Sequence, residues 1–316
     1  MQTIPSDSQP RSGVALVTGA AGFIGCHLVE RLVESGWAVR GIDDERSGDW
    51  SRPNVPVDRI GGALEAMSDE ELRVACDGVG AVFHLAAEKH NTPGVTPERL
   101  LDVNVAATRR LYEAAGRAGV GKIVFTSSLY AYGSLGPGPM AEDDVPRPQT
   151  LYGVSKLAGE HLLRVAAREH GLRWSVARLF FVYGPRQLAA GGYPSVVVRN
   201  FARLRRGEQP VVNGDGKQEL DYVYVDDCVD ALVALCASDY DGCTFNVAGG
   251  TPVSIGDLTR LMLGVAGSSL EPVGGPADWT AGTRRWGSTS LVAERLGWRA
   301  SVTLQEGLAR VWESSR

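Results

Sequence analysis

The residues best suited to chemistry are a tyrosine and a lysine four positions apart, in the segment TLYGVSK. Tyr152 and Lys156 would share one face of a helix, because side chains four residues apart are neighbours there. A tyrosine with its usual pKa near 10 is a poor base, and an adjacent ammonium should lower that pKa. Ser128, in the segment TSSLYAYG, could add a hydroxyl to the same reacting oxygen. The three residues suit removal of a proton from an alcohol while a hydride leaves the same carbon. A surface Tyr–Lys pair is the alternative.

A glycine-rich turn in VALVTGAAGFIG predicts the partner for that hydride. Gly19, Gly22 and Gly25 follow an apolar run and open an apolar-periodic stretch. This spacing lets the backbone bend tightly and approach a pyrophosphate at a helix N-terminus. Asp43 ends the second predicted strand about 20 residues further on, where a ribose hydroxyl would bind. An acid there favours NAD over NADP, although Arg40 or Arg46 could accept a 2′-phosphate.

The elements that must position these residues alternate between strand and helix up to residue 180. The predicted strands are Val14–Thr18, Trp37–Ile42, Ala81–Ala86, Ile123–Thr126 and Trp174–Leu179. The predicted helices are Phe23–Ser35, Asp69–Cys76, Pro97–Ala118 and Tyr152–His170. This alternation predicts an α/β fold with a doubly wound parallel sheet that helices cover on both faces.

Composition excludes several classes of function. The 316 residues are 44% hydrophobic and 22% charged, as in ordinary globular proteins, and the net charge of −5 argues against nucleic acid or membrane surfaces as partners. No apolar run approaches the length of a membrane span, and Met1–Gly13 reads as a disordered tail without a secretory h-region. The five cysteines form no CxxC pair, and no metal site is expected. An odd number of cysteines without a signal peptide fits a reducing cytoplasm.

The ordered motifs give the chain a resemblance to a known family. VTGAAGFIG, VFHLAA, NVAAT, FTSSLYAYG, YGVSK, FVYGPRQ, GDGKQELDYVYVDD, FNVAGG and LGW resemble the extended short-chain dehydrogenases/reductases, in the group of NAD-dependent nucleotide-sugar epimerases and dehydratases. The resemblance implies a Rossmann-type NAD-binding domain over 14–180. It also implies a smaller C-terminal lobe for the substrate over 181–316, from which about 209–249 returns to the large sheet. A nucleotide-diphosphate sugar, in first place a UDP-sugar, would be oxidised transiently at C4.

The same resemblance assigns roles to particular residues. Ser128, Tyr152 and Lys156 would be catalytic. The residues expected to bind NAD are Gly19, Gly22, Phe23, Ile24, Gly25, Asp43, Leu85, Ala86, Ala87, Lys89, Asn104, Tyr152 and Lys156. The residues expected at the substrate are Ser128, Tyr130, Phe181, Arg186, Val196 and Arg284.

Two positions depart from the family pattern. Phe181 stands where the family has an asparagine, and Leu220 stands where many members have an arginine. Both family residues contact the diphosphate, so two polar contacts are lost. Arg284 or its neighbour Arg285 could replace them, because an arginine fork suits phosphate, and Arg186 is a weaker candidate.

The reaction type depends on whether a further acid or base is present. One dehydratase group carries Asp-Glu directly after the catalytic Ser or Thr, where this chain has Leu129 and Tyr130. Glu88, followed by Lys89 and His90, could instead serve as a base at C5 or an acid at C6. C4 epimerisation is the leading expectation, with 4,6- or 5,6-elimination of water as the alternative. A non-catalytic NAD-sensing regulator is the alternative of another class, and the intact catalytic trio argues against it.

The resemblance also predicts a homodimer. The helices Pro97–Ala118 and Tyr152–His170 correspond to the pair that forms a four-helix interface in many family members. They carry more apolar residues than one core stripe needs, among them Leu100, Leu111, Leu162 and Val165. Plain core packing is the alternative.

Overall fold

The centre of the molecule is a seven-stranded parallel sheet in the order β10-β6-β5-β4-β1-β2-β3. The computed structural model describes residues 13–89, 92, 94–133, 138–187 and 195–314. The strands are β1 (Val14–Thr18), β2 (Ala38–Asp43), β3 (Asp58–Gly61), β4 (Val79–His84), β5 (Lys122–Ser128), β6 (Arg173–Leu179) and β10 (Cys243–Val247). The predicted doubly wound α/β fold is confirmed, and the strand order reverses between β1 and β4, where such folds bind ligands.

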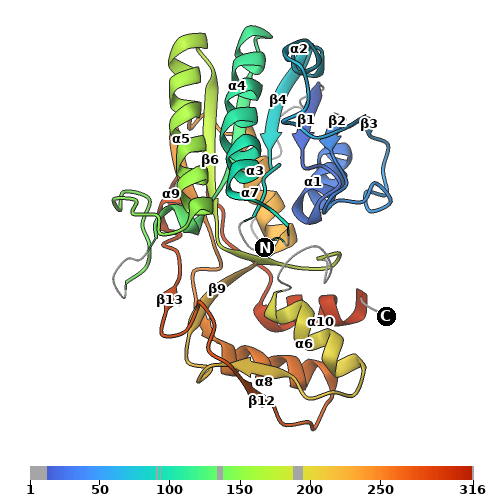
Figure 1. The fold of residues 1–316 in the computed structure, drawn as a ribbon, viewed down its shortest axis with the longest axis vertical. Coiled ribbons are helices and arrows are strands. Elements are labelled where there is room, and N and C mark those ends of the chain that lie inside the picture. Colours follow the sequence, from blue (N-terminus) through green and yellow to red (C-terminus); the bar gives the residue numbers. More distant parts are fainter. Residues whose placement is uncertain (1–12, 90–91, 93, 134–137, 188–194, 315–316) are drawn as a thin grey trace.

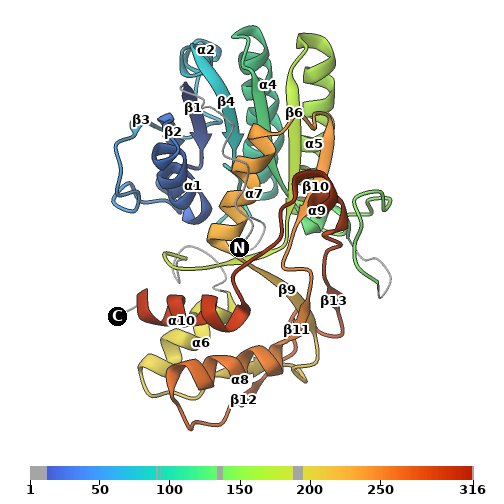
Figure 2. The same ribbon diagram turned by 180° about the vertical axis from the view of Figure 1, so that it is seen from behind.

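Helices cover both faces of this sheet, as Figures 1 and 2 show from opposite sides. One face carries α2 (Asp69–Cys76), α4 (Thr108–Arg117) and α5 (Leu151–His170), and the other carries α1 (Phe23–Glu34), α7 (Val225–Ala237) and α9 (Ser290–Leu296). The central strands β1 and β4 are near-continuous apolar runs because both of their faces are buried, whereas the edge strand β3 is mostly exposed. Leu163 packs in the core of the first face, and Leu232 packs in the core of the second.

The register brings the carboxyl ends of the central strands to one edge. Thr18 at the end of β1 pairs with Ile42 on β2 and with His84 on β4. The next residues along each strand are therefore neighbours at this edge. These residues are Gly19, Asp43 and Leu85, and all three are among the residues expected to bind the cofactor.

The stretch predicted as one helix over Pro97–Ala118 is helical throughout but not uniform. It consists of α3 (Pro97–Leu101), a π-helical segment over Asp102–Ala107, and α4. The side chain of Thr108 donates to the carbonyl of Val103, five residues earlier. π-Helical segments are frequent at functional sites, and this one carries Asn104.

The second lobe lies below the carboxyl edge of the sheet (Figure 1). In it β9 (Glu219–Tyr224) pairs with β7 (Phe181–Tyr183), β11 (Pro252–Ser254) and β13 (Arg284–Arg285), and β12 (Val273–Gly275) pairs with β8 (Val211–Asn213). The helices α6 (Val196–Arg205), α8 (Ile255–Ala266) and α10 (Leu304–Ser314) enclose a core that includes Phe201, Leu258 and Leu308.

The predicted division of the chain into lobes needs one change. Of the segment 209–249 expected to return to the large sheet, α7 and β10 do so, whereas β8 and β9 pair with lobe strands. The helix α9 also returns, because Val292 packs in the core beneath the sheet. Of the predicted tail, residues 1–12 lie outside the described part of the chain.

A buried carboxylate ties together the segments that cross between the lobes. Asp221 on β9 accepts the backbone N–H groups of Gly249 and Gly250, just after β10, and of Gly287, just after β13. Burial raises the pKa of this carboxyl to about 7, although the backbone donors oppose that rise. Asp221 therefore fixes the place where β13 enters the lobe.

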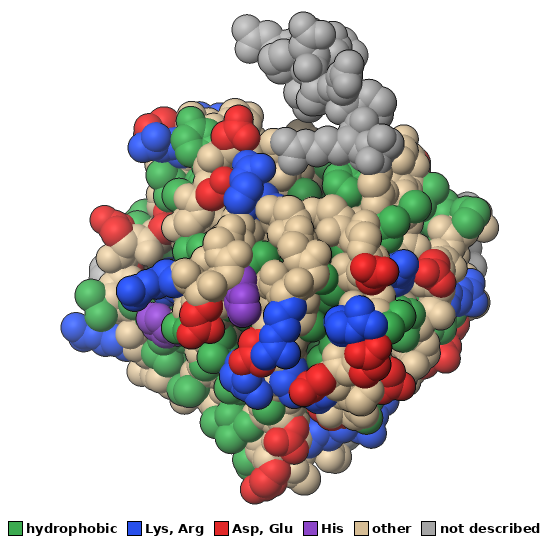
Figure 3. Space-filling view, turned by 90° about the horizontal axis from the view of Figure 1, so that it is seen from above, with side chains coloured by type: hydrophobic (Ala, Val, Ile, Leu, Met, Phe, Trp, Pro, Cys, Tyr) green, Lys and Arg blue, Asp and Glu red, His purple; other side chains and the backbone are tan. Residues whose placement is uncertain are grey.

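The surface is mixed in character. Positive and negative side chains are interleaved on the face seen from above (Figure 3). None of the described helices combines the length and the apolarity that a membrane crossing requires.

Leu100 and Leu111 are buried in the core, whereas Val165, 52% exposed, lies at the surface together with Leu101 and Val154.

Candidate active site

The glycine turn after β1 forms a cradle that side chains would fill. Gly19 has φ +72°, a conformation that favours glycine, and a Cβ on Gly25 would lie 1.9 Å from the Gly19 oxygen. Gly22 precedes α1 without a side-chain cap hydrogen bond, and the first turn of the helix contains no acid. The N–H groups at this helix end are therefore positioned for an anion, and the cradle fits the pyrophosphate of a dinucleotide.

Asp43 lies at the end of β2 beside this cradle. Its carboxylate accepts the N–H groups of Ala21 and Glu45 at 2.9 and 2.8 Å, and burial raises its pKa. Two of its roughly four lone-pair sites are thus used, which leaves capacity for ribose hydroxyls. Arg40 is engaged elsewhere, with Asp58 and with the carbonyls at the end of α2, and Arg46 pairs with Asp44.

The loop after β4 is held in place by side chains from three elements. Thr18 accepts the N–H groups of Leu85 and Ala86, and it contacts His84 at 2.7 Å. Asn104 accepts the N–H of Glu88 and donates to its carbonyl. Asn104 also donates to Ser155 on α5. It therefore connects this loop to the helix that carries Tyr152 and Lys156, as expected for a residue that orients the cofactor end of the sheet.

The predicted catalytic trio comes together at the end of β5. Ser128 terminates β5, and its hydroxyl forms a side-chain hydrogen bond with Tyr152, which lies in the first turn of α5. Lys156 follows one turn later, with its ammonium 4.7 Å from the centre of the Phe125 ring. The structure thus joins Ser128 to Tyr152 and places Lys156 one turn further along the same helix, and the shared substrate hydroxyl stays a prediction.

Burial dominates the ionisation of this trio. It raises the pKa of Tyr152 to about 12, and the Ser128 hydrogen bond opposes the rise. Burial also lowers the pKa of Lys156 to about 7, and the nearby Lys89 ammonium lowers it further, against Glu160. Desolvation thus outweighs the Ser128 hydrogen bond at the phenol, and the lowering of the Tyr152 pKa by Lys156 stays a prediction.

A buried ion pair anchors α5 to the sheet. Glu160 accepts from both the Nε and Nη2 atoms of Arg178 on β6, at 2.9 and 2.8 Å. Ser127, next to Ser128, also donates to Glu160 at 2.6 Å. Sequence reasoning gave no role to Glu160, yet it fixes the helix of Tyr152 relative to the strand of Ser128.

Glu88, the candidate extra acid or base, is already paired. Its carboxylate accepts from Arg99 at 2.8 Å, and Arg99 also binds Glu65 at 2.6 Å and lies 3.5 Å from Asp44. Its partner in the predicted loop, His90, lies outside the described residues. Lys89 as a whole residue is exposed, but its ammonium is surrounded by protein atoms, and this desolvation lowers its pKa.

The predicted substrate side of the site is aromatic. The ring of Tyr130 meets the ring of Tyr152 edge-on at 5.6 Å, and Trp279 packs against Tyr130 at the same distance. Arg285, not Arg284, faces this cluster, because neighbouring residues in a strand point to opposite sides. Arg284 instead pairs with Glu219 at 2.5 Å. Trp279 was missed, since a lone tryptophan in a loop has no sequence signature.

The departures from the family pattern lead to apolar contacts. The ring of Phe181 packs against Tyr222 at 5.8 Å, and Leu220 is buried in the core of the second lobe. Val196 opens α6 and is partly buried against the same core. None of these side chains supplies a polar group for a diphosphate.

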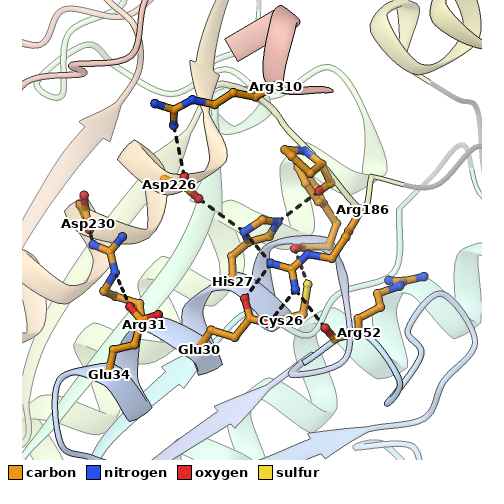
Figure 4. A network of polar contacts seen from close by, with 12 residues as sticks. Cys26, His27, Glu30, Arg31, Glu34, Arg52, Arg186, Asp226, Asp230 and Arg310 are labelled. Atoms are coloured by element: carbon orange, nitrogen blue, oxygen red, sulfur yellow. Dashed lines mark hydrogen bonds and ion pairs between the residues drawn. The ribbon is translucent and has the colours of Figure 1, made fainter. Parts of the chain in front are cut away.

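Arg186 connects the lobes (Figure 4). Its guanidinium binds both carboxylate oxygens of Glu30 on α1, at 2.8 and 2.7 Å, together with the carbonyl of Arg52. It also contacts His27, whose ring reaches Asp226 on α7. Because these partners use the guanidinium, the geometry supports a structural role for Arg186 over the predicted contact with substrate.

Comparison with known proteins agrees with this site. Residues 15–248 match the model of the NAD dependent epimerase/dehydratase family. The chain belongs to this family. It is 35% identical to the UDP-glucose 4-epimerase of Mycolicibacterium smegmatis, over 95% of this chain and 98% of that protein. It is 32% identical to a dTDP-glucose 4,6-dehydratase of Streptomyces griseus, over 93% and 91%.

The structural likeness extends over the same length. The crystal structure of UDP-glucose 4-epimerase from Thermotoga maritima, with UDP-glucose, superimposes with a TM-score of 0.89 at 33% identity. The match covers 96% of this chain and 98% of that one. As a member of the epimerase/dehydratase family, this chain is an NAD-dependent enzyme, and the glycine cradle and Asp43 fit that cofactor.

Proposed function

We propose that this enzyme interconverts the C4 epimers of a nucleotide-diphosphate sugar, with a UDP-sugar as its substrate. The arrangement of Ser128, Tyr152 and Lys156 at the carboxyl edge of the sheet supports oxidation at C4. Glu88, the remaining acid considered for the reaction, is held by Arg99. This ion pair carries the proposal, because elimination of water needs an acid or base beyond the trio.

The chain's own residues then divide the work of the proposed reaction. Tyr152, ionised, accepts the proton of the C4 hydroxyl, and Ser128 donates a hydrogen bond to the phenolic oxygen. Bound NAD supplies the chemistry of accepting the C4 hydride and returning it. Lys156, charged, stabilises the phenolate during oxidation. After the 4-keto sugar rotates to present its other face, Tyr152 returns the proton to the same C4 oxygen, so the proton and the hydride removed in the first step are both restored.

Elimination of water remains the competing reaction, since relatives of both kinds match the chain. The residues after Ser128 argue against it, because Leu129 and Tyr130 cannot act as the required acid–base pair at neutral pH. A non-catalytic NAD sensor would not need the hydrogen-bonded trio.

The test is incubation of the purified enzyme with UDP-glucose, UDP-galactose, UDP-N-acetylglucosamine and dTDP-glucose. NMR and mass spectrometry should find a C4 epimer of unchanged mass. Tyr152→Phe should lower turnover by a factor on the order of 10² to 10⁴ with NAD still bound, while Tyr240→Phe, at an exposed tyrosine, should not. Loss of one water from the substrate would establish a dehydratase. Full activity of Tyr152→Phe would refute Tyr152 as the base, and a wild type that binds NAD but turns over no nucleotide sugar would favour the sensor.

Glu88→Gln separates the two enzymatic readings. An epimerase should keep nearly all of its turnover, because Tyr152 handles the proton at C4. A dehydratase should stop after oxidation, which would appear as NADH absorbance without product.

We infer a homodimer formed through α3 and α5. The exposed apolar side chains of Leu101, Leu151, Val154 and Val165 on these helices support this assembly. Sedimentation should find a dimer at micromolar concentration that Val165→Glu weakens, and a monomeric wild type would contradict it. A cytoplasmic location is inferred from the five free cysteines.

A further inference from the structure

The guanidinium of Arg285 lies between two aromatic rings at the edge of the active site. It is 5.7 Å from the centre of the Tyr130 ring and 5.0 Å from that of Trp279. Burial lowers its pKa. Across the described part of the chain no carboxylate pairs with it, whereas its neighbour Arg284 has Glu219. A desolvated cation without an acid is costly, so this site is built for an anionic ligand.

The loop that carries Trp279 is tied by hydrogen bonds of the neighbouring residues, although the Trp279 side chain is 46% exposed. Asp278, next to it, accepts from Asn213 on β8 at 3.0 Å and from the N–H of Thr280 at 2.9 Å. Thr283, just before β13, closes the turn by donating to the carbonyl of Thr280. The loop therefore presents Trp279 at a fixed position against Tyr130 and Arg285.

We propose that Trp279 is a positioning residue, which together with Tyr130 holds the Arg285 guanidinium for the diphosphate of the substrate. This inference rests on the proposed nucleotide-sugar substrate. Arg285 on β13 is paired with Leu220 on β9. Leu220 occupies the position where many family members have an arginine, so Arg285 places a cation on the neighbouring strand. Attraction between cation and ring keeps the guanidinium extended before the anion binds.

The geometry favours the diphosphate over an acidic group at C6 of the sugar. Tyr130 contacts both Tyr152 and Arg285, so the guanidinium lies two ring contacts away from the catalytic phenol. A pyranose carries its diphosphate at C1, opposite C4, whereas C6 hangs from the carbon next to C4. Because the Tyr130 ring contacts both the catalytic phenol and the guanidinium, we assign the guanidinium to the diphosphate at C1.

The experiment compares binding of UDP and uridine to the NAD-loaded enzyme by isothermal titration calorimetry. Trp279→Ala should weaken UDP binding about three- to thirtyfold and leave uridine binding unchanged. Trp279→Phe should restore most of the loss, since it keeps a ring over the cation. Arg285→Ala should weaken UDP at least as much as Trp279→Ala. Arg284→Ala, which removes a partner of Glu219 and a contact with the Trp286 ring, should have little effect.

A double variant distinguishes positioning from a separate contact. Adding Trp279→Ala to Arg285→Ala should cause no further loss, because the ring acts through the guanidinium. Equal weakening of UDP and uridine, additive losses, or unchanged UDP binding would overturn the proposal. Circular dichroism checks that each variant is folded.

The two proposals can fail separately. If the wild type turns over UDP-sugars but Trp279→Ala binds UDP normally, only the role of Trp279 is wrong. If the wild type neither binds UDP nor turns over any nucleotide sugar, the proposed function is wrong and this inference with it. If UDP shows the predicted pattern but the product has lost water, the positioning role stands and the epimerase is wrong.

Discussion

Replacing Gly25 by alanine should weaken NAD binding severely with only a moderate loss of stability. A Cβ at this position would lie 1.9 Å from the Gly19 oxygen and 2.9 Å from the Ala20 Cα. Contacts below 3.0 Å essentially do not occur for real Cβ atoms, so α1 and the turn must separate by about 1 Å. The obstacle is backbone, which cannot rotate away as a side chain could.

The size of the effect follows from that displacement. Hydrogen bonds from the start of α1 to a pyrophosphate would lengthen from about 2.9 Å to nearly 4 Å, beyond hydrogen-bond range. Each bond to a charged group contributes roughly 1.5–3 kcal/mol, so losing two should weaken NAD by a factor on the order of 10² to 10⁴. Overpacking should lower the free energy of unfolding by about 1–3 kcal/mol.

Two alanine substitutions provide matched controls. On Gly22 the Cβ would lie 3.1 Å from the same Gly19 oxygen, so a shift of a few tenths of an ångström suffices and NAD should weaken much less. On Gly264 in α8 nothing lies within 4 Å, and alanine should stabilise the helix by about 0.5–1 kcal/mol without affecting NAD.

The assays are calorimetric titration of NAD and urea unfolding of the three variants. NAD bound by Gly25→Ala within threefold of the wild type, in a folded protein, would refute the role given to this close approach. Equal losses for Gly22→Ala and Gly25→Ala would show that flexibility, and not the 1.9 Å contact, matters.

Three further predictions concern the same half of the molecule. Glu160→Leu leaves Arg178 buried and unpaired and should cost about 3–5 kcal/mol in urea unfolding, whereas adding Arg178→Met should recover most of it. Asp43→Ala should weaken NAD and reduce discrimination against NADP in titrations, and a wild type that prefers NADP would contradict the assignment. Because burial holds the pKa of Lys156 at about 7 against 10.5 in the unfolded chain, the unfolded chain binds more protons between these values. Stability should therefore rise with pH across that window, and Lys156→Met should flatten the rise.

The Rossmann half could be predicted closely because its signals are local. The observed β1 (Val14–Thr18) and α2 (Asp69–Cys76) have the predicted bounds, and β5 extends only slightly beyond Ile123–Thr126. Buried parallel strands read as apolar runs, and the glycine turn marks its own junction. The edge strand β3 was missed, since most of its residues are exposed and carry no alternating pattern.

The second half and the partners of the site residues could not be predicted, because they depend on long-range pairing. Glu88 and Arg99 are close in sequence, but nothing there shows that Glu65 joins them. The choice between Arg284 and Arg285 rests on which face of β13 meets Tyr130. The sequence shows that two arginines stand next to each other at this position. Only the strand register shows which of the two side chains enters the site.

The energetics of the catalytic trio explain why the enzyme needs its ligands to become reactive. Burial raises the pKa of Tyr152 and lowers that of Lys156, so burial acts against the charged form of each group. Catalysis instead needs a phenolate beside an ammonium. The Ser128 hydrogen bond and the field of Glu160 favour that ionised pair only in part. The remaining stabilisation must come from what binds, so Tyr152 becomes a base only where a substrate hydroxyl and a hydride acceptor are both in place.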